Sequence, residues 1–577
     1  MERRVFAAIF LSFLVLVVYQ TYVVPPPVDP AATTTPASTP SPTPLPGALG
    51  SAATPDLTPL PGAVPSATPT VEAAPPAKPL VADVADRDIT VATDSVIAVF
   101  STRGAVLKSY RLRHYADAKG DPLELIPANL SAGLYPRPFT IVTDDANETA
   151  VLAAALYQPS VDALSLGSEP GVLSFQYRDA SGLNATKTFA FRPNGQVYVV
   201  NVQAAVDVGG APRALTIAFG PAIGLGYSPE GATRTPARAI YSLNGEVDRQ
   251  TAEDVQEQPR FEGTLRFAGV DDHYFLAAAL PPPGTSRVEY VAVVEPVPAD
   301  PLGTVRTFVA FAVRPNLGGP PAASVSMPFF IGPKDFDRLR EADGQLVRAI
   351  DFGIFSPIVV PLLQALKWVN GYLGNYGWSI VVLTVLINIL IFPLRHRSMV
   401  SMKKMQALQP DMKAIQERYA KYKVTDPERQ KMNSEMMALY KQKGVNPASG
   451  CVPMLLTMPI LLAFYNLLSQ AIELRNAPFF GWIVDLSSKD PYYVWPILMG
   501  GSMFWQQRMM PTTADPMQAK IFMFMPIIFT VMFLGMPSGL VIYWLTSNLL
   551  TIGQQVLTNR IIGTPAPVRA QGSPRKA

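Results

Sequence analysis

Long apolar runs set the pattern of this chain, and they gather toward its C-terminal end. About 20 apolar residues are needed to cross a bilayer as a helix. A further run begins at Val5, directly behind Arg3 and Arg4, and Gln20 follows it where the small residues of a cleavage site would be expected. The pattern therefore predicts a six-span α-helical membrane protein in which residues 1–24 form an uncleaved signal anchor. The other predicted spans are 376–394, 451–469, 492–507, 521–536 and 539–557.

Between the anchor and the clustered spans, polar and apolar positions follow two other patterns. Residues 25–80 contain 17 prolines among Ala, Thr and Ser, a composition that cannot bury a core and is typical of an extended linker. Over residues 81–340, apolar positions repeatedly alternate with polar ones, as at Leu173, Phe175 and Tyr177. Because a period of two is typical of strands, this segment is expected to be a large, mainly antiparallel β-sandwich.

A mixed helical pattern precedes the clustered spans. Residues 351–370 combine prolines with Lys367 and Trp368, whose side chains favour headgroup depth, and they predict an amphipathic helix at the membrane interface. A plain linker helix is the alternative. The remaining predicted parts are a core of five spans at 371–560, a cytoplasmic helical hairpin within it at 395–445, and a basic tail at 561–577.

Loop charges predict how the spans are oriented. Residues 395–443 carry twelve Lys or Arg and five Asp or Glu, and the residues after Leu557 carry four basic side chains and no acidic one. Cytoplasmic loops of membrane proteins are enriched in Lys and Arg. We therefore expect this loop and both termini in the cytoplasm, with residues 25–350 on the far side of the membrane.

Composition and spacing argue against several kinds of chemistry. A single cysteine, Cys451, permits no disulfide within the chain, and three scattered histidines show no metal-ligand spacing. A net charge of +3 predicts no DNA-binding surface. The five clustered spans contain no Asp, Glu, Lys, Arg or His, which coupled transporters normally carry at depth. We expect no catalytic residue, cofactor or metal ion, and interpret Asp272 and His273 as part of a solvated loop.

The clustered spans contain neutral polar side chains in place of charged ones. Asn388 and Asn548 are the costliest of these to bury without partners, which makes them candidates for lining a wet cavity. Hydrogen bonding between helices is the alternative for each polar residue. Tyr543 and Trp544 either offer amphipathic contacts to another polypeptide or belong to an interfacial aromatic belt. The other polar candidates are Thr384, Thr457 and Gln506.

The predicted cytoplasmic loop carries a heptad pattern. Six residues spaced alternately three and four apart predict a seam on one helix. A capping box at 425–428 begins a second helix, whose apolar face holds Met432, Met436 and Leu439. An antiparallel coiled coil accounts for this geometry, while the flexible methionines suit varied apolar partners and the positive charge suits anionic lipid or ribosomal RNA. The seam consists of Met405, Leu408, Met412, Ile415, Tyr419 and Tyr422.

Several blocks of sequence resemble the YidC family of bacterial membrane protein insertases, in its Gram-negative form with a large periplasmic domain. The resemblance covers about residues 350–560, and two weaker blocks lie upstream, at 102–104 and 332–335. Its blocks include Gly377-Trp378-Ser379-Ile380, Met402-Lys403-Lys404-Met405, Gly444-Val445-Asn446-Pro447, Gly450-Cys451-Val452-Pro453, Asp485-Leu486-Ser487 and Pro537-Ser538-Gly539-Leu540.

The resemblance implies an inner-membrane insertase and chaperone, not an enzyme. Family members hold five core helices around a hydrophilic groove that is open to the cytoplasm and to lipid. The implied partners are newly made membrane proteins, phospholipid, a ribosome and a Sec-type translocon. Family members work with or without that translocon. The groove is expected at Thr384, Asn388, Thr457, Gln506, Tyr543, Trp544 and Asn548. Contacts of the hairpin with clients or ribosome are expected at Lys403, Lys404, Met405, Met412, Lys421, Lys423, Met432 and Met436.

Two positions depart from the family pattern. Family members usually carry an arginine five residues before the proline that ends the first core span, and this chain has Asn388 there, counting back from Pro393. A glutamine that often precedes Met-Pro-Ile is replaced by Thr457. The groove is therefore expected to be polar but uncharged, with Arg395 and Arg397 at its cytoplasmic mouth as partial substitutes. The alternative functions are a small-molecule transporter and a membrane-anchored periplasmic binding or assembly protein.

Overall fold

The computed structural model of this chain describes residues 77–562 apart from short gaps. The predicted signal anchor, the predicted linker up to residue 76 and the tail beyond residue 562 lie outside the described residues. One unit of the chain contains the helical hairpin at Ala407–Pro447, and the other contains Glu72–Gln406 and Ala448–Ala577. The gaps are 118–119, 128–135, 193–194, 222, 224–236, 297–304, 318, 321, 421, 423–426, 445–451 and 510–515.

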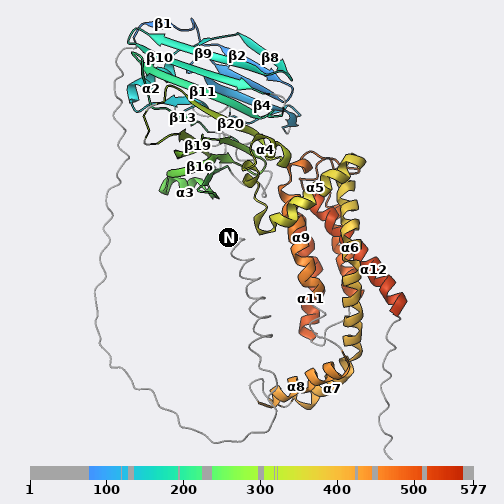
Figure 1. The fold of residues 1–577 in the computed structure, drawn as a ribbon. Helices are drawn as coiled ribbons and strands as arrows, with labels where there is room; N and C mark the ends of the chain where they lie inside the picture. Colours follow the sequence, from blue (N-terminus) through green and yellow to red (C-terminus); the bar gives the residue numbers. More distant parts are fainter. Residues whose placement is uncertain are drawn as a thin grey trace, which may run out of the picture. The chain divides into compact units, whose positions relative to one another are not determined.

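Strands that bury every second residue build the larger of two sheets. In β10 (Leu183–Phe191) the burial alternates along the whole strand, as a period of two requires. The other strands of this larger sheet are β1 (Pro79–Val81), β6 (Thr140–Val142), β7 (Gln158–Pro159), β9 (Gly171–Asp179), β11 (Val199–Val208), β12 (Ala211–Pro212), β13 (Thr216–Phe219), β14 (Arg238–Leu243), β15 (Glu246–Gln250), β16 (Arg260–Asp271), β17 (Phe275–Ala279), β18 (Thr285–Pro296), β19 (Val305–Arg314) and β20 (Val325–Pro333). The main strand order is β1-β9-β10-β11-β20-β17-β16-β18-β19-β13-β6. Figure 1 shows β9, β10 and β11 within this sheet.

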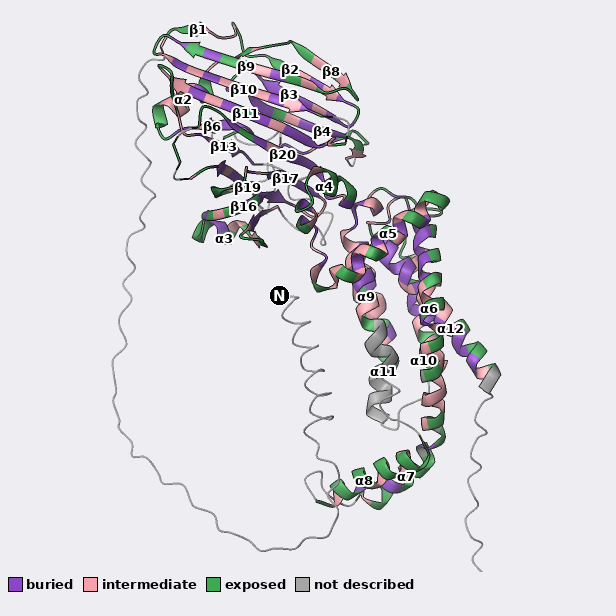
Figure 2. Ribbon diagram, viewed as in Figure 1, coloured by how far each residue is buried: buried purple, intermediate pink, exposed green. Residues whose placement is uncertain are grey.

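A second sheet packs against the first through aromatic side chains. The ring of Phe100, in the smaller sheet, lies 4.6 Å from that of Phe189 in β10, measured between centroids. Figure 2 shows buried residues along the strands of both sheets. The predicted β-sandwich is thus confirmed, with one parallel pair that the pattern did not indicate, between β2 and β8. The smaller sheet is β5 (Pro122–Glu124), β4 (Val106–Ala116), β3 (Val96–Ser101), β2 (Asp88–Thr93) and β8 (Ala163–Gly167), in that order.

Short helices accompany the sheets and lead toward the predicted spans. Asp335 begins one of them, α4, by accepting hydrogen bonds from the backbone amides of Asp337 and Arg338. The same segment then continues through two 3₁₀ turns. These elements are α2 (Ala146–Ala154), α3 (Ala252–Glu257), α4 (Phe336–Ala342), η2 (Leu346–Ala349) and η3 (Gly353–Phe355).

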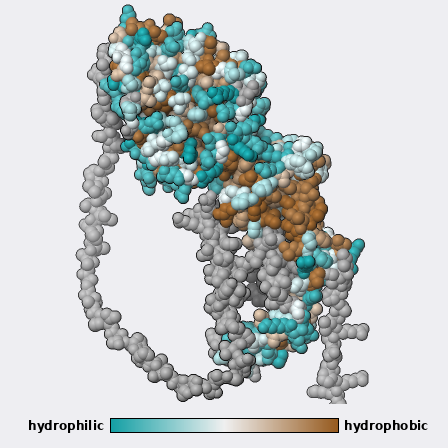
Figure 3. Space-filling view, viewed as in Figure 1, coloured by the Kyte–Doolittle hydropathy of each residue, from teal (hydrophilic) through white to brown (hydrophobic). Residues whose placement is uncertain are grey.

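Helices make up the C-terminal part of the chain, as the apolar runs predict. Among the described residues, Tyr376–Met405 is long and apolar enough to cross a membrane, and Met523–Phe533 is a shorter apolar helix. The count of six spans stays a prediction. Hydrophobic surface gathers over this part of the chain (Figure 3). Ile389 and Leu390 are among its exposed apolar residues. The helices are α5 (Ser356–Leu373), α6 (Tyr376–Ala407), α9 (Val452–Gln470), α10 (Val494–Met509), α11 (Pro516–Phe533) and α12 (Ser538–Ile562), with η5 (Ile472–Leu474) after α9.

The hairpin unit contains α7 (Gln409–Arg418) and α8 (Pro427–Gln442). The prediction of one continuous helix along the heptad seam is wrong, because α6 ends at Ala407 and α7 begins two residues later. Pro410 lies in the first turn of α7, where its missing N–H group costs nothing, whereas inside a continuous helix it would break a hydrogen bond. Ile415 and Met432 are buried in this unit, and the Tyr440 hydroxyl lies 3.1 Å from the Met412 sulfur.

Candidate functional site

A recess lies between α6, α9 and α12. Five of its eight lining residues belong to α6, and each lies three or four residues from another of the five, so they occupy one face of that helix. The lining residues are Thr384, Ile387, Asn388, Ile391 and Arg395 of α6, Ile460 of α9, and Tyr543 and Ser547 of α12.

Two of the predicted groove residues bring polar groups to the α6 wall of this recess. The Thr384 hydroxyl donates to the Ile380 carbonyl at 2.6 Å, and the Asn388 amide nitrogen donates to the Thr384 carbonyl at 2.8 Å. Both bonds run back one turn along the helix, so they satisfy the donors within α6. The side-chain oxygen of Asn388 is left to accept a bond from elsewhere.

Arg395 supplies that bond and brings a positive charge into the recess. Its Nη1 donates to Asn388 Oδ1 at 3.0 Å and to Thr551 Oγ1 of α12 at 2.9 Å. Arg395 lies seven residues beyond Asn388, which is two turns along the same helix face, and its long side chain points back along α6. The expected uncharged groove therefore does not describe the recess.

Further polar contacts join the C-terminal halves of α6 and α12. His396 Nδ1 lies 3.2 Å from the Thr558 hydroxyl, and the Gln554 amide donates to the Phe392 carbonyl at 3.3 Å. The sequence places Arg395 at the mouth of the expected groove, but the expectation misses His396, which falls in the predicted loop, and the polar residues after Asn548. The signal was a second polar stripe on α12, formed by Thr551, Gln554, Gln555 and Thr558.

The other predicted groove residues lie in different surroundings. The Asn548 amide is buried and donates to Ser502 Oγ of α10 at 3.0 Å, so it makes a bond between helices. Trp544 packs on Phe533 of α11, with 4.9 Å between ring centroids. Tyr543 lines the recess and stacks on Phe464 of α9 at 4.3 Å.

Two predicted groove residues remain, Gln506 and Thr457. Gln506 is half-buried on α10 and is not among the residues that line the recess. Thr457 belongs to α9, but its side chain lies outside the described residues.

The predicted hairpin contacts divide between buried and open positions. Lys404 is exposed, whereas Lys403, Met405, Met412 and Met436 are half-buried, and Met432 is buried. Part of the methionine face therefore packs inside the hairpin. Lys421 and Lys423 lie outside the described residues.

The interpretation of Asp272 and His273 as a solvated loop is wrong. His273 Nε2 lies 2.6 Å from the Ser469 carbonyl near the end of α9, and Asp272 Oδ1 accepts bonds from the backbone amides of Tyr274 and Phe275. Burial raises the pKa of the Asp272 carboxyl. His273 is thus part of the contact between the β-sandwich and α9, and Asp272 holds the loop that carries it.

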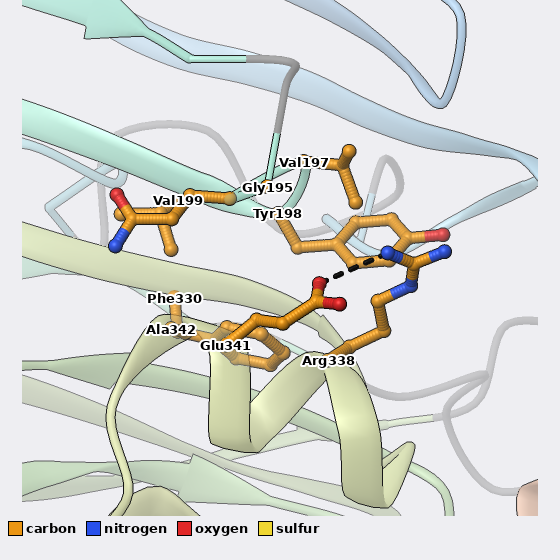
Figure 4. Close-up of a pocket in the computed structure, with 9 residues that line it drawn as sticks. Gly195, Val197, Tyr198, Val199, Phe330, Arg338, Glu341 and Ala342 are labelled. Carbon is orange, nitrogen blue, oxygen red and sulfur yellow. Dashed lines mark hydrogen bonds and ion pairs between the residues drawn. The ribbon is translucent and has the colours of Figure 1, made fainter.

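A second hollow lies in the β part, between the start of β11, β20 and α4. Figure 4 shows Tyr198 and Phe330 on opposite sides of a pair formed by Arg338 and Glu341, whose side chains lie 3.0 Å apart. Because the two charges pair with each other and the other labelled groups are mainly apolar, this hollow has the features of a packing seam.

Comparison with known proteins gives the same assignment along almost the whole chain. A family model described as the YidC periplasmic domain matches residues 88–365, and one described as 60Kd inner membrane protein matches 368–564. The membrane protein insertase YidC of Geotalea daltonii is 34% identical over 582 residues, covering 97% of this chain and 99% of its own. That of Oleidesulfovibrio alaskensis is 36% identical over 504 residues, covering 85% and 90%.

Among solved structures, an active YidC insertase with its first transmembrane domain resolved matches 83% of this chain and 93% of its own. Its identity is 18% and its TM-score is 0.33, which is too low to carry an argument. The assignment rests instead on the two family models and on relatives that match over their full length. The chain belongs to the YidC family of membrane protein insertases.

Proposed function

We propose that this protein inserts newly made membrane proteins into the inner membrane by admitting their polar ends to the recess between α6, α9 and α12. The observation that carries the proposal is the Arg395 guanidinium, which is held in the recess by Asn388 and Thr551. A cation fixed by two neutral acceptors keeps its charge available to a polypeptide that enters.

The energetic task of an insertase is to move polar groups past hydrocarbon. A charged residue at the centre of a bilayer costs about 2.5–3.5 kcal/mol on the insertion scale, and each Leu, Ile, Phe or Val gains only about 0.3–0.6 kcal/mol. A polar recess that extends into the bilayer shortens the apolar path of a client's tail. Burial of the client's own apolar segment in lipid then drives its release, so the proposal needs no covalent step.

Arg395 adds selectivity to this path. Among the described residues, no carboxylate pairs with it, so an acidic client residue meets an uncompensated positive charge. Two opposite unit charges at 4 Å attract by about 4 kcal/mol at an effective dielectric constant of 20. That attraction is large enough to offset the cost of bringing one carboxylate toward the bilayer centre.

The test compares two arginines on α6. Arg395 lines the recess, whereas Arg397 is exposed and does not. We expect Arg395→Gln to slow insertion of a single-span client with an acidic tail by about tenfold or more, and to leave a client with a neutral tail nearly unchanged. Arg397→Gln is the matched control and should affect neither client. Equal effects of the two substitutions on both clients would contradict the proposal.

The remaining assignments complete this picture. We propose that residues 25–350 are periplasmic, that both termini are cytoplasmic, and that the hairpin meets clients or a ribosome on the cytoplasmic side. A Sec-type translocon is a further proposed partner. Support for the orientation comes from the twelve basic residues at 395–443.

A further inference from the structure

Contacts with the β-sandwich hold the periplasmic end of α9 and the segment after it at two residues, Ser469 and Arg475. His273 meets the Ser469 carbonyl at 2.6 Å, in the last turn of α9. Arg475, just after η5, donates to the Ala116 carbonyl at 3.3 Å, and its guanidinium lies 5.2 Å from the Phe275 ring centroid. Between these two points stands Glu473, whose partner is a lysine on α5.

That lysine, Lys367, lies at the centre of a cluster of charges. Its Nζ is 3.2 Å from Glu473 Oε1 and 3.3 Å from Asp335 Oδ2, and it also contacts Asp337. Only 7% of the Glu473 side chain and 17% of the Asp335 side chain are exposed, so solvent screens these two contacts little. The exposed Asp337 is the weaker partner.

Asp335 is itself fixed on the side of the β-sandwich. Its Oδ1 accepts the backbone amides of Asp337 and Arg338, which leaves Oδ2 for Lys367. The preceding residue, Lys334, is buried and donates to Asp271 Oδ2 at 3.2 Å, at the end of β16. The consecutive residues Lys334 and Asp335 thus connect the start of α4 to the larger sheet and to α5, respectively.

We propose that Lys367 is a positioning residue, which holds α5 and the end of α9 against the β-sandwich and thereby sets the wall of the recess that Ile460 forms. Ile460 lies on the same helix as Ser469, and a shift at one end of a helix moves the other, because a helix is a stiff element. The link to insertion rests on the proposed function; the docking role does not.

The charges around Lys367 agree with this role. Burial lowers the pKa of its ammonium group, but Glu473, Asp337 and Asp335 outweigh burial and raise that pKa above its usual value. The cluster therefore keeps Lys367 charged at neutral pH. The other titratable groups nearby are Tyr376 of α6 and Tyr115 of β4.

The experiment measures the distance between the two parts of the full-length protein in vesicles of phosphatidylethanolamine and phosphatidylglycerol. Spin labels are placed on cysteines at Val291 in β18 and Val484 after η5, both exposed, with Cys451 changed to serine. Lys367→Met should broaden the narrow distance distribution of the parent protein. It should also slow client insertion by about tenfold.

Three comparisons make the result decisive. Lys367→Arg keeps the charge and should restore both readouts, whereas Lys108→Met, which removes a half-exposed pair with Asp88, should change neither. If Lys367→Met fails to fold, Asp335→Asn keeps an N-cap oxygen for α4 and tests the same contact.

Each outcome bears on a different part of the proposal. An unchanged distance distribution in Lys367→Met would overturn the docking role. If Lys367→Arg failed to restore the two readouts, the dependence of docking on the charge of residue 367 would be overturned. A broadened distribution with normal insertion would overturn the link to the recess. An inactive parent protein would count against the proposed function, while the distances would still decide the docking role.

Discussion

Replacing Asn388 with leucine removes one of the two acceptors that hold Arg395 in the recess. A hydrogen bond to a charged group contributes about 1.5–3 kcal/mol, and each 1.4 kcal/mol is a factor of about ten. Thr551 still accepts a bond from the same Nη1 at 2.9 Å, so we expect the lower end of this range. Asn388→Leu should then slow insertion of a client with an acidic tail by about tenfold.

The assay follows protection of the client's tail from protease in proteoliposomes. Asn388→Gln keeps an amide oxygen and is the matched control, so it should retain most of the activity. In an Arg395→Gln background, Asn388→Leu should have little further effect, because the two residues act through one contact. Equal rates for the leucine and glutamine variants, or additive losses with Arg395→Gln, would refute this account of the recess.

Three further predictions test other parts of the structure. A Cβ atom on Gly500 would lie 1.9 Å from Thr530 Oγ1, so Gly500→Ala should destabilise the protein by about 1–3 kcal/mol in thermal unfolding, and Thr530→Ala should restore part of this loss. Burial raises the pKa of Glu473, so the folded protein binds that proton more tightly than the unfolded chain and stability should fall as pH rises above 4.5 through the raised pKa. Glu473→Gln should flatten that slope, and an unchanged slope would show that the carboxyl is not its source. Reversing the charges of Lys403 and Lys404 should weaken crosslinking of the protein to ribosome-bound nascent chains, and unchanged crosslinking would remove them from that role.

The regular elements could be predicted because burial imposes a period on the sequence. Strands such as β10 bury every second residue, and the apolar run that begins at Tyr376 marks α6. Long-range pairing leaves no such period. The parallel pairing of β2 with β8 joins segments about 70 residues apart, and neither strand alone indicates its partner.

The candidate site was predictable only in part, for a related reason. Hydropathy ends the first core span near Pro393, yet α6 continues to Ala407, so the cation at Arg395 was assigned to the loop. The position of Arg395 in the sequence also does not show that its side chain reaches back two helical turns to Asn388. Conversely, Asn548 fits a wet cavity and an interhelical bond equally well by sequence, and only its contact with Ser502 distinguishes them.

The central claim is that a client's polar end occupies the recess beside Arg395. A photo-crosslinking amino acid at position 388, compared with one at the exposed Leu498 of α10, tests it on ribosome-stalled clients of increasing length. The account predicts crosslinks from 388 to the hydrophilic tail at intermediate lengths, and none to that tail from 498. Crosslinks to the tail from 498 with none from 388 would contradict it.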